Sequence, residues 1–307
     1  MKGTADVVVV GGGIIGCATA AELARAGAAV VLVERGPIAA GASGRNHGLI
    51  FTPEDPGLRA LAGASMARYR ELAAESSQVG IGLDAEPVGL LVAVTQDHQW
   101  EAARREAAGA ARGGRPVEYL DAAGARAAEP ALGPGVLGGY LIGDGYRVDP
   151  AALTLALAYR ARASGAEVAT HTEAKQVLAP GGRVRGLATD AGVITTEIVV
   201  DAAGPWAAKL ARSVAQPLPI GGVRGWLLLT AARPGLMHHL VVSAGWHLPG
   251  RAGAPGPATV AAHGSGAPVP RDVGTLVQQN PDQHILLGGS RAPSLDADGF
   301  EEASATT

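Results

Sequence analysis

The stretch from Val7 to Arg35, VVVVGGGIIGCATAAELARAGAAVVLVER, decides the fold of this chain. Its four consecutive valines predict a strand that is buried on both faces. The glycines that follow, Gly11, Gly13 and Gly16, have the GxGxxG spacing that lets a backbone turn tightly and approach a pyrophosphate. A helix of small residues and a second apolar run complete a βαβ unit. The sequence therefore predicts a dinucleotide-binding unit near the start of the chain.

The two ends of this unit carry the groups that would hold the nucleotide. A helix is expected to begin at Ile14 and Ile15, where unpaired N–H groups and the positive end of the helix dipole favour a phosphate. Glu34 stands at the end of the second strand, where a carboxylate can accept hydrogen bonds from an adenosine ribose and disfavours a 2′-phosphate. The alternative, a glycine-rich turn without a ligand, does not account for strand, glycines, helix, strand and acid in register.

Composition and charge limit the classes of function. The chain has 307 residues, 47% of them hydrophobic, which is enough for one large or two ordinary domains. Its 25 basic and 28 acidic residues give a net charge of −3, so nothing favours nucleic acid as a partner. The apolar stretches are shorter than the ~18 residues that predict a membrane span, and the first residues lack a secretory pattern. We therefore predict a cytoplasmic protein without a transmembrane segment.

Cysteine and histidine residues give little support to a metal site. Cys17 is the only cysteine, so an intrachain disulfide is impossible, and we interpret it as a small packing residue of the first helix. His238, His239 and His247 suggest a metal only weakly, because adjacent side chains on a strand point to opposite faces and no paired carboxylate completes the set. We predict that the chain holds no metal.

A glycine-rich segment follows the opening unit. Residues 39–48 are too rich in glycine for regular structure and too long for an idle turn, so they form a candidate functional loop. Periodicity and turn residues then predict helices at 57–78, 96–111, 121–128, 150–164 and 205–212. The same signals predict a β-ribbon over 177–200 and strands at 88–94, 140–142, 167–170, 199–202, 226–230, 240–242, 258–262 and 285–287.

The order of these elements predicts an α/β fold in which one domain interrupts another. Nucleotide-binding βα units alternate with mostly antiparallel sheet. We expect residues 1–80 and 145–215 to form a Rossmann-like domain. The remaining residues, 81–144 and 216–307, are expected to form an α+β, mostly antiparallel domain that carries the substrate.

Four segments carry a resemblance to a known family. They are VVVGGGIIG at 8–16 with the acid at 34, GASGRN at 41–46, DG with VDP within 144–150, and VVDAAGPWA at 199–207. The chain resembles FAD-dependent amine and amino-acid oxidoreductases of the D-amino-acid oxidase type, which include glycine oxidase, sarcosine oxidase and related dehydrogenase subunits. The last segment is the most specific, because it adds a second glycine-ended strand beside the pyrophosphate. The resemblance implies FAD as the cofactor and an FAD-binding domain of the glutathione-reductase type.

The resemblance also implies which residues contact FAD. The loop at 41–46 would run past the pyrophosphate toward the flavin, and the segment before Val177 would touch adenine. Some relatives attach FAD through a histidine, but the matching position here is Arg45, so we expect non-covalent FAD. The expected contacts are Gly11, Gly13, Ile14, Ile15, Gly16, Glu34, Arg35, Ser43, Arg45, Asn46, His47, Gly48, Ala174, Ala203, Gly204 and Trp206.

In such enzymes, hydride leaves a substrate Cα–H for flavin N5, and the imine that forms is hydrolysed. The implied substrate is a small amine or amino acid of the glycine, sarcosine or D-amino-acid type, with oxygen or another molecule as electron acceptor. His47 is a candidate for a catalytic role, although positioning or packing near the flavin is the alternative. Arg224 and Arg291 are candidate cations for a substrate carboxylate or, alternatively, structural charges. Tyr146 and Trp246 are expected to line the pocket or to pack between domains.

Family members continue beyond the strand that contains Gly288 through a helix, a GLRP-like strand and a glycine-rich segment that closes over the flavin. This chain stops at Thr307, so we expect the final segment of the FAD domain, with the family's usual substrate arginine, to be absent. Two other functions stay open. One is a truncated or inactive nucleotide-binding protein or a subunit that needs a partner chain, and the other is an NAD-linked dehydrogenase.

Overall fold

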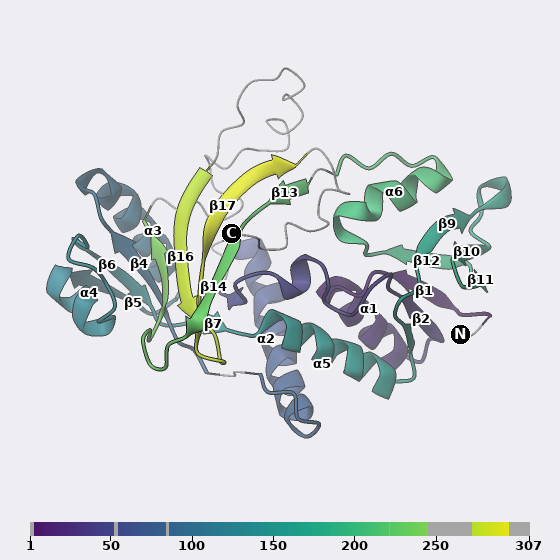
Figure 1. The fold of residues 1–307 in the computed structure, drawn as a ribbon, viewed down its shortest axis with the longest axis horizontal. Helices are drawn as coiled ribbons and strands as arrows, with labels where there is room; N and C mark the ends of the chain where they lie inside the picture. The colour runs from purple at the N-terminus through teal and green to yellow at the C-terminus, as the bar shows by residue number, and fades with distance from the viewer. Residues whose placement is uncertain (1–2, 52–54, 84–85, 221, 245–271, 295–307) are drawn as a thin grey trace, which may run out of the picture. The chain divides into compact units, whose positions relative to one another are not determined.

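Strand β1 (Val7–Val10) lies inside a four-stranded parallel sheet (Figure 1). The structure is a computed structural model that describes residues 3–51, 55–83, 86–220, 222–244 and 272–294. The order of the sheet is β12 (Ile198–Asp201), β1, β2 (Val30–Val33) and β8 (Glu167–Ala169). Both neighbours of β1 run parallel to it, and Val10 stands opposite Asp201. The predicted βαβ unit is confirmed, and a second glycine-ended strand lies directly beside the first.

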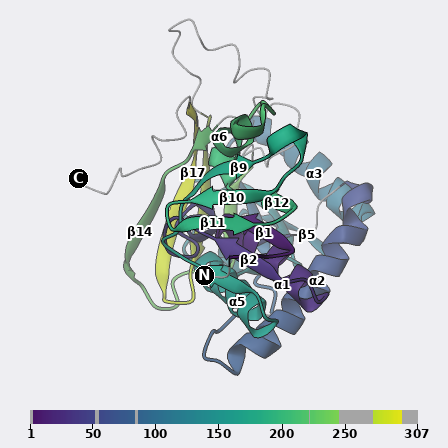
Figure 2. The ribbon, with the colours of Figure 1, turned by 90° about the vertical axis from the view of Figure 1, so that its right-hand side faces the viewer.

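The two faces of this parallel sheet are covered by different layers. Helices α1 (Ile14–Arg25) and α5 (Pro150–Ala163) cover one face, where their alanines pack on the strand valines. The other face is covered by an antiparallel sheet made of β9 (Ala174–Leu178), β10 (Gly186–Thr189) and β11 (Gly192–Thr195). Figure 2 shows the three layers. Burial on both faces explains why β1 and β2 are continuous runs of Val and Leu.

Short helices complete this part of the chain. They are η1 (Ala42–Gly44), η3 (Pro180–Gly182), η4 (Gly204–Trp206), α6 (Ala207–Ala211) and η5 (Arg212–Val214). The helix predicted at 205–212 is therefore a sequence of three short turns. The ribbon predicted over 177–200 is confirmed by β9, β10 and β11, which pair as an antiparallel sheet.

The described residues divide into two compact units. Unit 1 comprises residues 3–46 and 150–222, and unit 2 comprises residues 47–149 and 223–294. The first crossing between them therefore lies after Asn46, whereas the sequence placed it near residue 80. The physical reason is pairing within unit 2, because β3 (Leu49–Ile50) forms a two-stranded sheet with β7 (Tyr146–Arg147).

Unit 2 is built on an eight-stranded sheet. In order, the strands are β13 (Gly222–Arg224), β17 (His284–Ser294), β16 (Asp272–Gln279), β15 (Leu240–Ser243), β4 (Leu90–Val94), β6 (Gly138–Ile142) and β5 (Val117–Asp121), and β14 (Leu227–Ala232) also pairs with β17. β15 runs parallel to β4, and the other registers resolved in this sheet are antiparallel. The sheet is mostly antiparallel, as predicted.

Helices cover both faces of this sheet. Helix α3 (Trp100–Arg112), which follows η2 (Asp97–Gln99), packs its alanines against one face. Helix α4 (Ala122–Ala128) packs Ala125 against the other face. Helix α2 (Pro56–Ser77) begins after the N-cap Asp55, whose carboxylate accepts a hydrogen bond from the amide of Gly57. Among the described helices, none is both long and apolar enough to cross a membrane.

Several strands of unit 2, among them β3, β5, β7 and β16, were not predicted. β5 has an exposed, non-alternating sequence, and β16 includes a glycine and two glutamines, so neither has a clear apolar period. β3 is only two residues long and forms through its pairing with β7. The strand expected at 258–262 lies outside the described residues.

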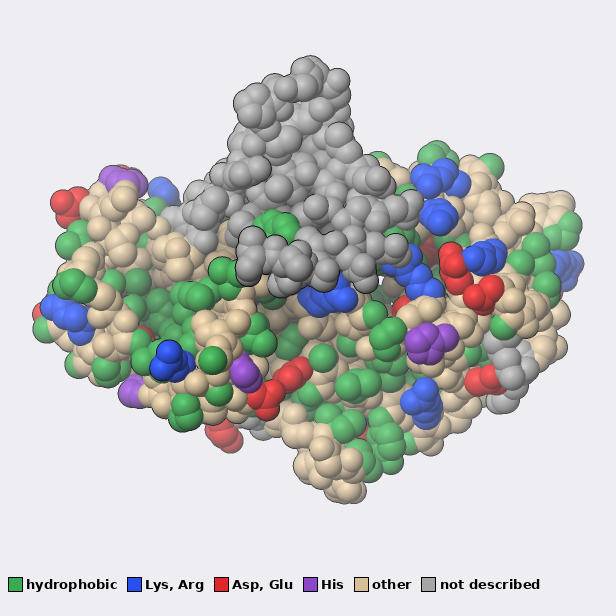
Figure 3. Space-filling model, viewed as in Figure 1, with side chains coloured by type: hydrophobic (Ala, Val, Ile, Leu, Met, Phe, Trp, Pro, Cys, Tyr) green, Lys and Arg blue, Asp and Glu red, His purple; other side chains and the backbone are tan. Residues whose placement is uncertain are grey.

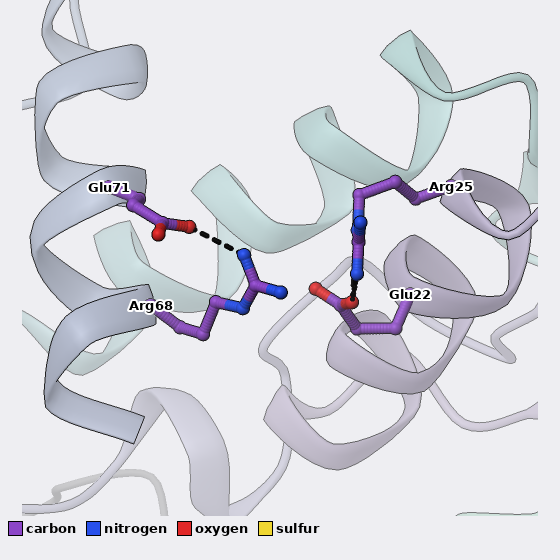
Figure 4. A network of polar contacts seen from close by, with 4 residues as sticks. All are labelled: Glu22, Arg25, Arg68 and Glu71. Carbon is purple, nitrogen blue, oxygen red and sulfur yellow. Dashed lines mark hydrogen bonds and ion pairs between the residues drawn. The ribbon is translucent and has the colours of Figure 1, made fainter. Parts of the chain in front are cut away.

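Exposed charges are interspersed on the surface. The face drawn in Figure 3 mixes basic and acidic side chains with apolar and uncharged ones. Figure 4 shows two pairs of this kind, each within one helix: Glu22 with Arg25 on α1, and Arg68 with Glu71 on α2. Because both partners of each pair are about half exposed, such pairs contribute only about 0–0.5 kcal/mol and mainly mark the solvent side of each helix.

Candidate functional site

The glycines after β1 are required by close backbone contacts in unit 1. Gly11 has a φ angle of +113°, and a β-carbon there would lie 2.4 Å from the carbonyl oxygen of Ala202. A β-carbon at Gly16 would lie 1.9 Å from the carbonyl oxygen of Gly11. A larger residue at either position must therefore move the backbone. Because Ala202 follows β12, the turns after β1 and β12 are in direct contact.

The carboxylate of Glu34 is held by the loops around it. Its Oε2 accepts a hydrogen bond from the amide of Gly12 at 2.6 Å, and its Oε1 accepts one from the amide of Gly36 at 2.8 Å. Each oxygen keeps a second lone pair, so the carboxylate can still accept a hydrogen bond from a ribose hydroxyl. The sequence predicted the ribose contact, and the structure adds that Glu34 also shapes the glycine turn.

The first turn of α1 is completed by a serine from a distant loop. The N-cap residue Gly13 has no side chain, and the Oγ of Ser43 accepts a hydrogen bond from the amide of Ile14 at 2.9 Å. The amides of Ile15 and Gly16 lie in the same first turn, where a helix offers them no acceptor. Backbone N–H groups beside a hydroxyl form a favourable environment for a phosphate.

The loop that carries Ser43 is shaped by its own asparagine. Nδ2 of Asn46 donates to the carbonyl oxygen of Ala42 at 2.9 Å and to that of Ser43 at 3.2 Å. The helix of this loop, η1, packs against α5, and the neighbouring Arg45 is exposed. Asn46 therefore stabilises the loop, a role that the sequence did not indicate.

The turn after β12 is the second glycine turn of unit 1. Gly204 has a φ angle of +57°, and no described atom lies within 4 Å of the position a β-carbon would take there. The carboxylate of Asp201 accepts a hydrogen bond from the amide of Ala203 at 3.1 Å, and burial raises the pKa of Asp201. The guanidinium of Arg35 lies 4.0 Å from the ring centroid of Trp206. This cation–π contact joins the end of β2 to the second turn.

Ala174, the predicted adenine contact, begins β9 after a segment that runs beside Glu34. The amide of Thr172 donates to the carbonyl oxygen of Glu34 at 2.8 Å, and that of His171 donates to the carbonyl oxygen of Gly36. Ala174 itself packs against the apolar layer between the two sheets of unit 1. The structure therefore brings this segment to the acidic end of β2.

His47 belongs to unit 2, where it leads into β3. Both ring nitrogens are inaccessible to solvent, and neither has a hydrogen-bond partner among the described residues. Burial lowers the pKa of His47 to about 4. The ring is therefore uncharged at neutral pH and presents one N–H donor and one lone pair. Because a base with such a low pKa accepts a proton poorly at pH 7, the ring is better suited to positioning than to proton transfer.

The residues around His47 are fixed by contacts within unit 2. The carbonyl oxygen of Gly48 accepts a hydrogen bond from the amide of Val148 at 2.9 Å. The hydroxyl of Tyr146 accepts one from the guanidinium of Arg70 on α2 at 3.0 Å. Tyr146 is therefore held by α2 in addition to its strand pairing.

The remaining candidate residues are placed only in part. Arg224 ends β13 and Arg291 lies in β17, which is the neighbouring strand, but their side chains lie outside what the structure describes. Trp246 and His247 lie outside the described residues.

Three residues of unit 2 were missed by sequence analysis. Gln278 is 2% exposed, and its Nε2 donates to the carbonyl oxygen of His47. A β-carbon at Gly288 would lie 2.5 Å from Nε2 of the same histidine. Glu129, which is fully buried, accepts hydrogen bonds from the amides of His238 at 2.8 Å and His239 at 2.9 Å. The sequence offers only a weak signal for Gln278 and Glu129, which are polar residues within or beside apolar segments.

The buried carboxylate of Glu129 is stabilised by its hydrogen bonds. Burial opposes its charge, but the hydrogen bonds from His239 and His238 outweigh this effect, so that the pKa of Glu129 is lowered. Nδ1 of His239 lies 3.6 Å from the carboxylate. Within the described residues, no group of three or more His, Cys, Asp or Glu side chains could hold a metal ion.

The geometry of unit 1 fits a dinucleotide such as FAD. The two glycine turns touch each other, the first turn of α1 offers amides and a hydroxyl, and an acid stands at the end of β2. This combination is that of a Rossmann-type phosphate site with a ribose acceptor. The second turn, after β12, supplies further backbone beside the first.

The chain belongs to the DAO family of FAD-dependent oxidoreductases, whose family model matches residues 6–306. It is 32% identical over 244 residues to a subunit of the anaerobic glycerol-3-phosphate dehydrogenase of Escherichia coli, an alignment that covers 74% of this chain and 42% of the relative. It is 34% identical over 236 residues to glycine oxidase of Geobacillus kaustophilus, with 74% of this chain and 62% of that enzyme covered. The chain thus spans about half the length of these curated relatives.

The solved structures give the same fold. The crystal structure of glycine oxidase from Geobacillus kaustophilus superimposes with a TM-score of 0.78 and 26% identity, and the match covers 96% of this chain and 74% of that chain. The FAD-dependent fold and the family's cofactor, both expected from the sequence, are confirmed.

Proposed function

We propose that this chain binds FAD non-covalently and oxidises a small amine or amino acid of the glycine, sarcosine or D-amino-acid type. The observation that carries this proposal is the contact between the two glycine-ended strands, β1 and β12, next to the first turn of α1. A dinucleotide cofactor with a pyrophosphate fits this pair of turns. The family supplies FAD as the cofactor, and glycine oxidase is among the relatives.

In the proposed complex, residues of unit 1 hold the ADP part of the cofactor. The amides of Ile15 and Gly16, with the hydroxyl of Ser43, would bind phosphate oxygens. Glu34 would accept hydrogen bonds from the ribose while still holding Gly12. The set also includes Gly11, Gly13, Ile14, Arg35, Arg45, Asn46, Ala174, Ala203, Gly204 and Trp206.

The residues of unit 2 would orient the reacting groups. When bound, FAD supplies the two-electron chemistry, in which hydride passes from the substrate Cα–H to flavin N5 and the resulting imine is hydrolysed. His47 and Gly48 would lie near the isoalloxazine, where the neutral ring of His47 offers a hydrogen-bond donor and an acceptor. Arg224 and Arg291, on neighbouring strands, are the proposed cations for a substrate carboxylate.

A second substrate class has support from the comparisons. One relative is a subunit of a glycerol-3-phosphate dehydrogenase, so oxidation of glycerol 3-phosphate together with a partner subunit is the alternative to amine oxidation. The electron acceptor would then be oxygen or another molecule.

We also propose that the protein acts in the cytoplasm on a small-molecule substrate, without nucleic acid.

The proposal is tested by purifying the chain and recording its visible spectrum with and without added FAD. We expect flavin absorption bands that remain after gel filtration and disappear from the protein fraction after denaturation. Anaerobic bleaching of these bands by glycine, sarcosine, D-alanine or glycerol 3-phosphate then identifies the substrate class. Protein without flavin bands, even after addition of FAD, would contradict the proposal.

The other two functions make different predictions in the same experiment. An NAD-linked dehydrogenase would change nicotinamide absorbance with one of these substrates and bind no flavin. An inactive nucleotide-binding protein or an incomplete subunit would bind FAD without bleaching by any substrate. In that case, bleaching by a substrate would require the addition of a partner chain.

A further inference from the structure

Two adjacent glutamines on β16 are buried side by side, but their hydrogen bonding differs. Gln278 is 2% exposed and Gln279 is 3% exposed. Because successive side chains of a strand point to opposite faces, the two amides reach different neighbours. The pair therefore provides an internal comparison between two buried glutamines in one strand.

Both the nitrogen and the oxygen of the Gln279 side-chain amide form hydrogen bonds within the protein. Its Nε2 donates to the carbonyl oxygens of Arg233 and Gln283, and its Oε1 accepts a hydrogen bond from the amide of Met237 at 3.0 Å. A side chain with all of these bonds ties the connection before β15 to the turn between β16 and β17. Its role is explained by the fold alone.

Only one of the two polar atoms of the Gln278 side-chain amide forms a hydrogen bond among the described residues. Its Nε2 donates to the carbonyl oxygen of His47, but its Oε1 has no hydrogen-bond partner among the described residues. Leaving a buried polar atom without a hydrogen-bond partner destabilises the folded state. A buried leucine in the same strand, such as Leu276, avoids this cost, so the fold alone does not explain a glutamine at 278.

A glycine on the next strand makes room for the histidine ring. Residues 278 and 276 of β16 stand opposite Leu286 and Gly288 of β17, so their side chains share one face of the sheet. A β-carbon at Gly288 would lie 2.5 Å from Nε2 of His47 and 2.5 Å from Cδ2 of Leu227. The imidazole of His47 therefore occupies space that any other residue at 288 would fill.

We propose that Gln278 is a positioning residue that fixes His47 over Gly288 and, with it, presents uncompensated hydrogen-bonding atoms to the flavin or substrate. Gln278 holds the segment through the backbone carbonyl of His47, so this contact uses neither ring nitrogen. The bound group would provide hydrogen-bonding partners for the His47 ring nitrogens and for Oε1 of Gln278. This inference rests on the proposed function only for the identity of the ligand, since the positioning itself concerns the protein without FAD.

The test measures the ring of His47 directly, in the full chain without FAD. Isotope-labelled histidine allows the ring to be titrated by NMR, and the variant His47→Gln assigns its signal by removing it. In the wild type we expect a neutral ring above pH 5.

Gln278→Leu removes the donor with little change in side-chain size. We expect this variant to raise the pKa of His47 toward 6.5 by about one unit or more, because the released segment becomes hydrated. Gln279→Leu is the matched control, which we expect to leave this titration unchanged although it removes more hydrogen bonds.

A second arm uses FAD binding, measured by the quenching of flavin fluorescence. We expect Gln278→Leu to weaken FAD binding about three- to ten-fold and to shift the visible flavin bands. If Gln278→Leu does not fold, Gln278→Met, which also lacks the donor, takes its place. A wild-type ring that titrates near pH 6.5, an unchanged titration in the variant, or an equal shift in the control overturns the proposal. If the wild type fails to bind FAD, the proposed function is wrong, while the titration still decides the role of Gln278.

Discussion

The two polar clusters of the candidate site differ in how completely the protein itself satisfies them. In unit 1, both carboxylate oxygens of Glu34 and the Oγ of Ser43 accept hydrogen bonds from nearby amides. In unit 2, the ring nitrogens of His47 and the Oε1 of Gln278 have no partner among the described residues. The first cluster shapes the backbone that a nucleotide would contact, whereas the second holds polar atoms at an energetic cost. The hydrogen bonds of the first cluster are thus explained by the fold, whereas the polar atoms of the second cluster have no partner within the described protein.

The largest expected effect comes from breaking the shape of the first cluster. The variant Gly16→Ala places a β-carbon against the carbonyl oxygen of Gly11, so the turn after β1 must open. We expect FAD binding to weaken about 100-fold or more, and the protein to lose about 2–3 kcal/mol of stability. Fluorescence titration and urea unfolding measure the two effects.

Gly63→Ala is the control for this variant, since Gly63 is also helical but has no described atom near its β-carbon position. This exchange is expected to stabilise α2 by about 0.5–1 kcal/mol and to leave FAD binding unchanged. Equal FAD affinity in Gly16→Ala and the wild type would show that the turn after β1 does not hold the cofactor.

The next effect tests a buried carboxylate of unit 2, Glu129, whose Oε2 accepts two backbone hydrogen bonds while its Oε1 has no partner among the described residues. Glu129 is fully buried and accepts two backbone hydrogen bonds, so its exchange for glutamine removes charge-assisted bonds. We expect Glu129→Gln to lose about 2–3 kcal/mol of stability in urea unfolding at pH 7, without a change in FAD affinity. Because its pKa is lowered on folding, this contribution is present above pH 4.5 and is lost as the pH falls through the folded value.

Glu197→Gln is the matched control for the buried carboxylate. Glu197 is 68% exposed and pairs with Arg185 at 2.8 Å, a surface contact worth about 0–0.5 kcal/mol. If Glu129→Gln loses as little stability as this control, the charge of the buried carboxylate does not contribute to the free energy of unfolding.

The two clusters also differ in what the sequence could predict. The cluster of unit 1 lies in two short segments whose residues follow one another in a known motif, and the predicted contact between the turns after β1 and β12 is confirmed by their parallel register. The roles of Ser43 and Asn46 as loop-forming residues were not predicted, because a serine 29 positions away from Ile14 carries no local signal.

The cluster of unit 2 could not be predicted, because it depends on strand register. Gln278 and His47 are 231 positions apart and meet only when β16 and β17 pair. A one-residue slip would turn Gln278 to the other face of the sheet and bring Gln279 to His47. Without a pairing register, the sequence shows two equivalent glutamines, and the structure alone distinguishes them.

A smaller effect is expected from the titration of His47. Its pKa is about 4 in the folded protein and ordinarily 6.5, so between these values only the unfolded chain binds the proton. Stability should therefore fall as the pH is lowered from 6.5 to 4. Since the ring is only partly buried, we expect this group to account for about 1 kcal/mol between pH 7 and pH 5.

Urea unfolding of the wild type and His47→Gln at the two pH values isolates this contribution. The variant should lose about 1 kcal/mol less than the wild type on acidification. His98→Gln removes an exposed histidine on η2 and should keep the wild-type difference. If His47→Gln and the wild type lose the same stability, the ring is not held neutral by the fold.

The smallest effect tests whether the satisfied cluster also binds a ligand. In Ser43→Ala the amide of Ile14 loses its acceptor, which resembles the loss of an N-cap and should cost about 0.5–1 kcal/mol. A bound phosphate can replace the hydroxyl as acceptor for this amide, so FAD should recover part of the lost stability. We therefore expect FAD to raise the melting temperature of Ser43→Ala at least as much as that of the wild type and to bind no more weakly, because the stabilisation by a ligand and its affinity are linked. Thr19→Ala is the control, because it removes a hydroxyl that donates to the carbonyl oxygen of Ile15 in the same helix. We expect it to change neither the affinity for FAD nor the rise in melting temperature that FAD causes. A smaller thermal shift by FAD in Ser43→Ala than in Thr19→Ala, at saturating FAD, would mean that the amide of Ile14 does not meet the phosphate.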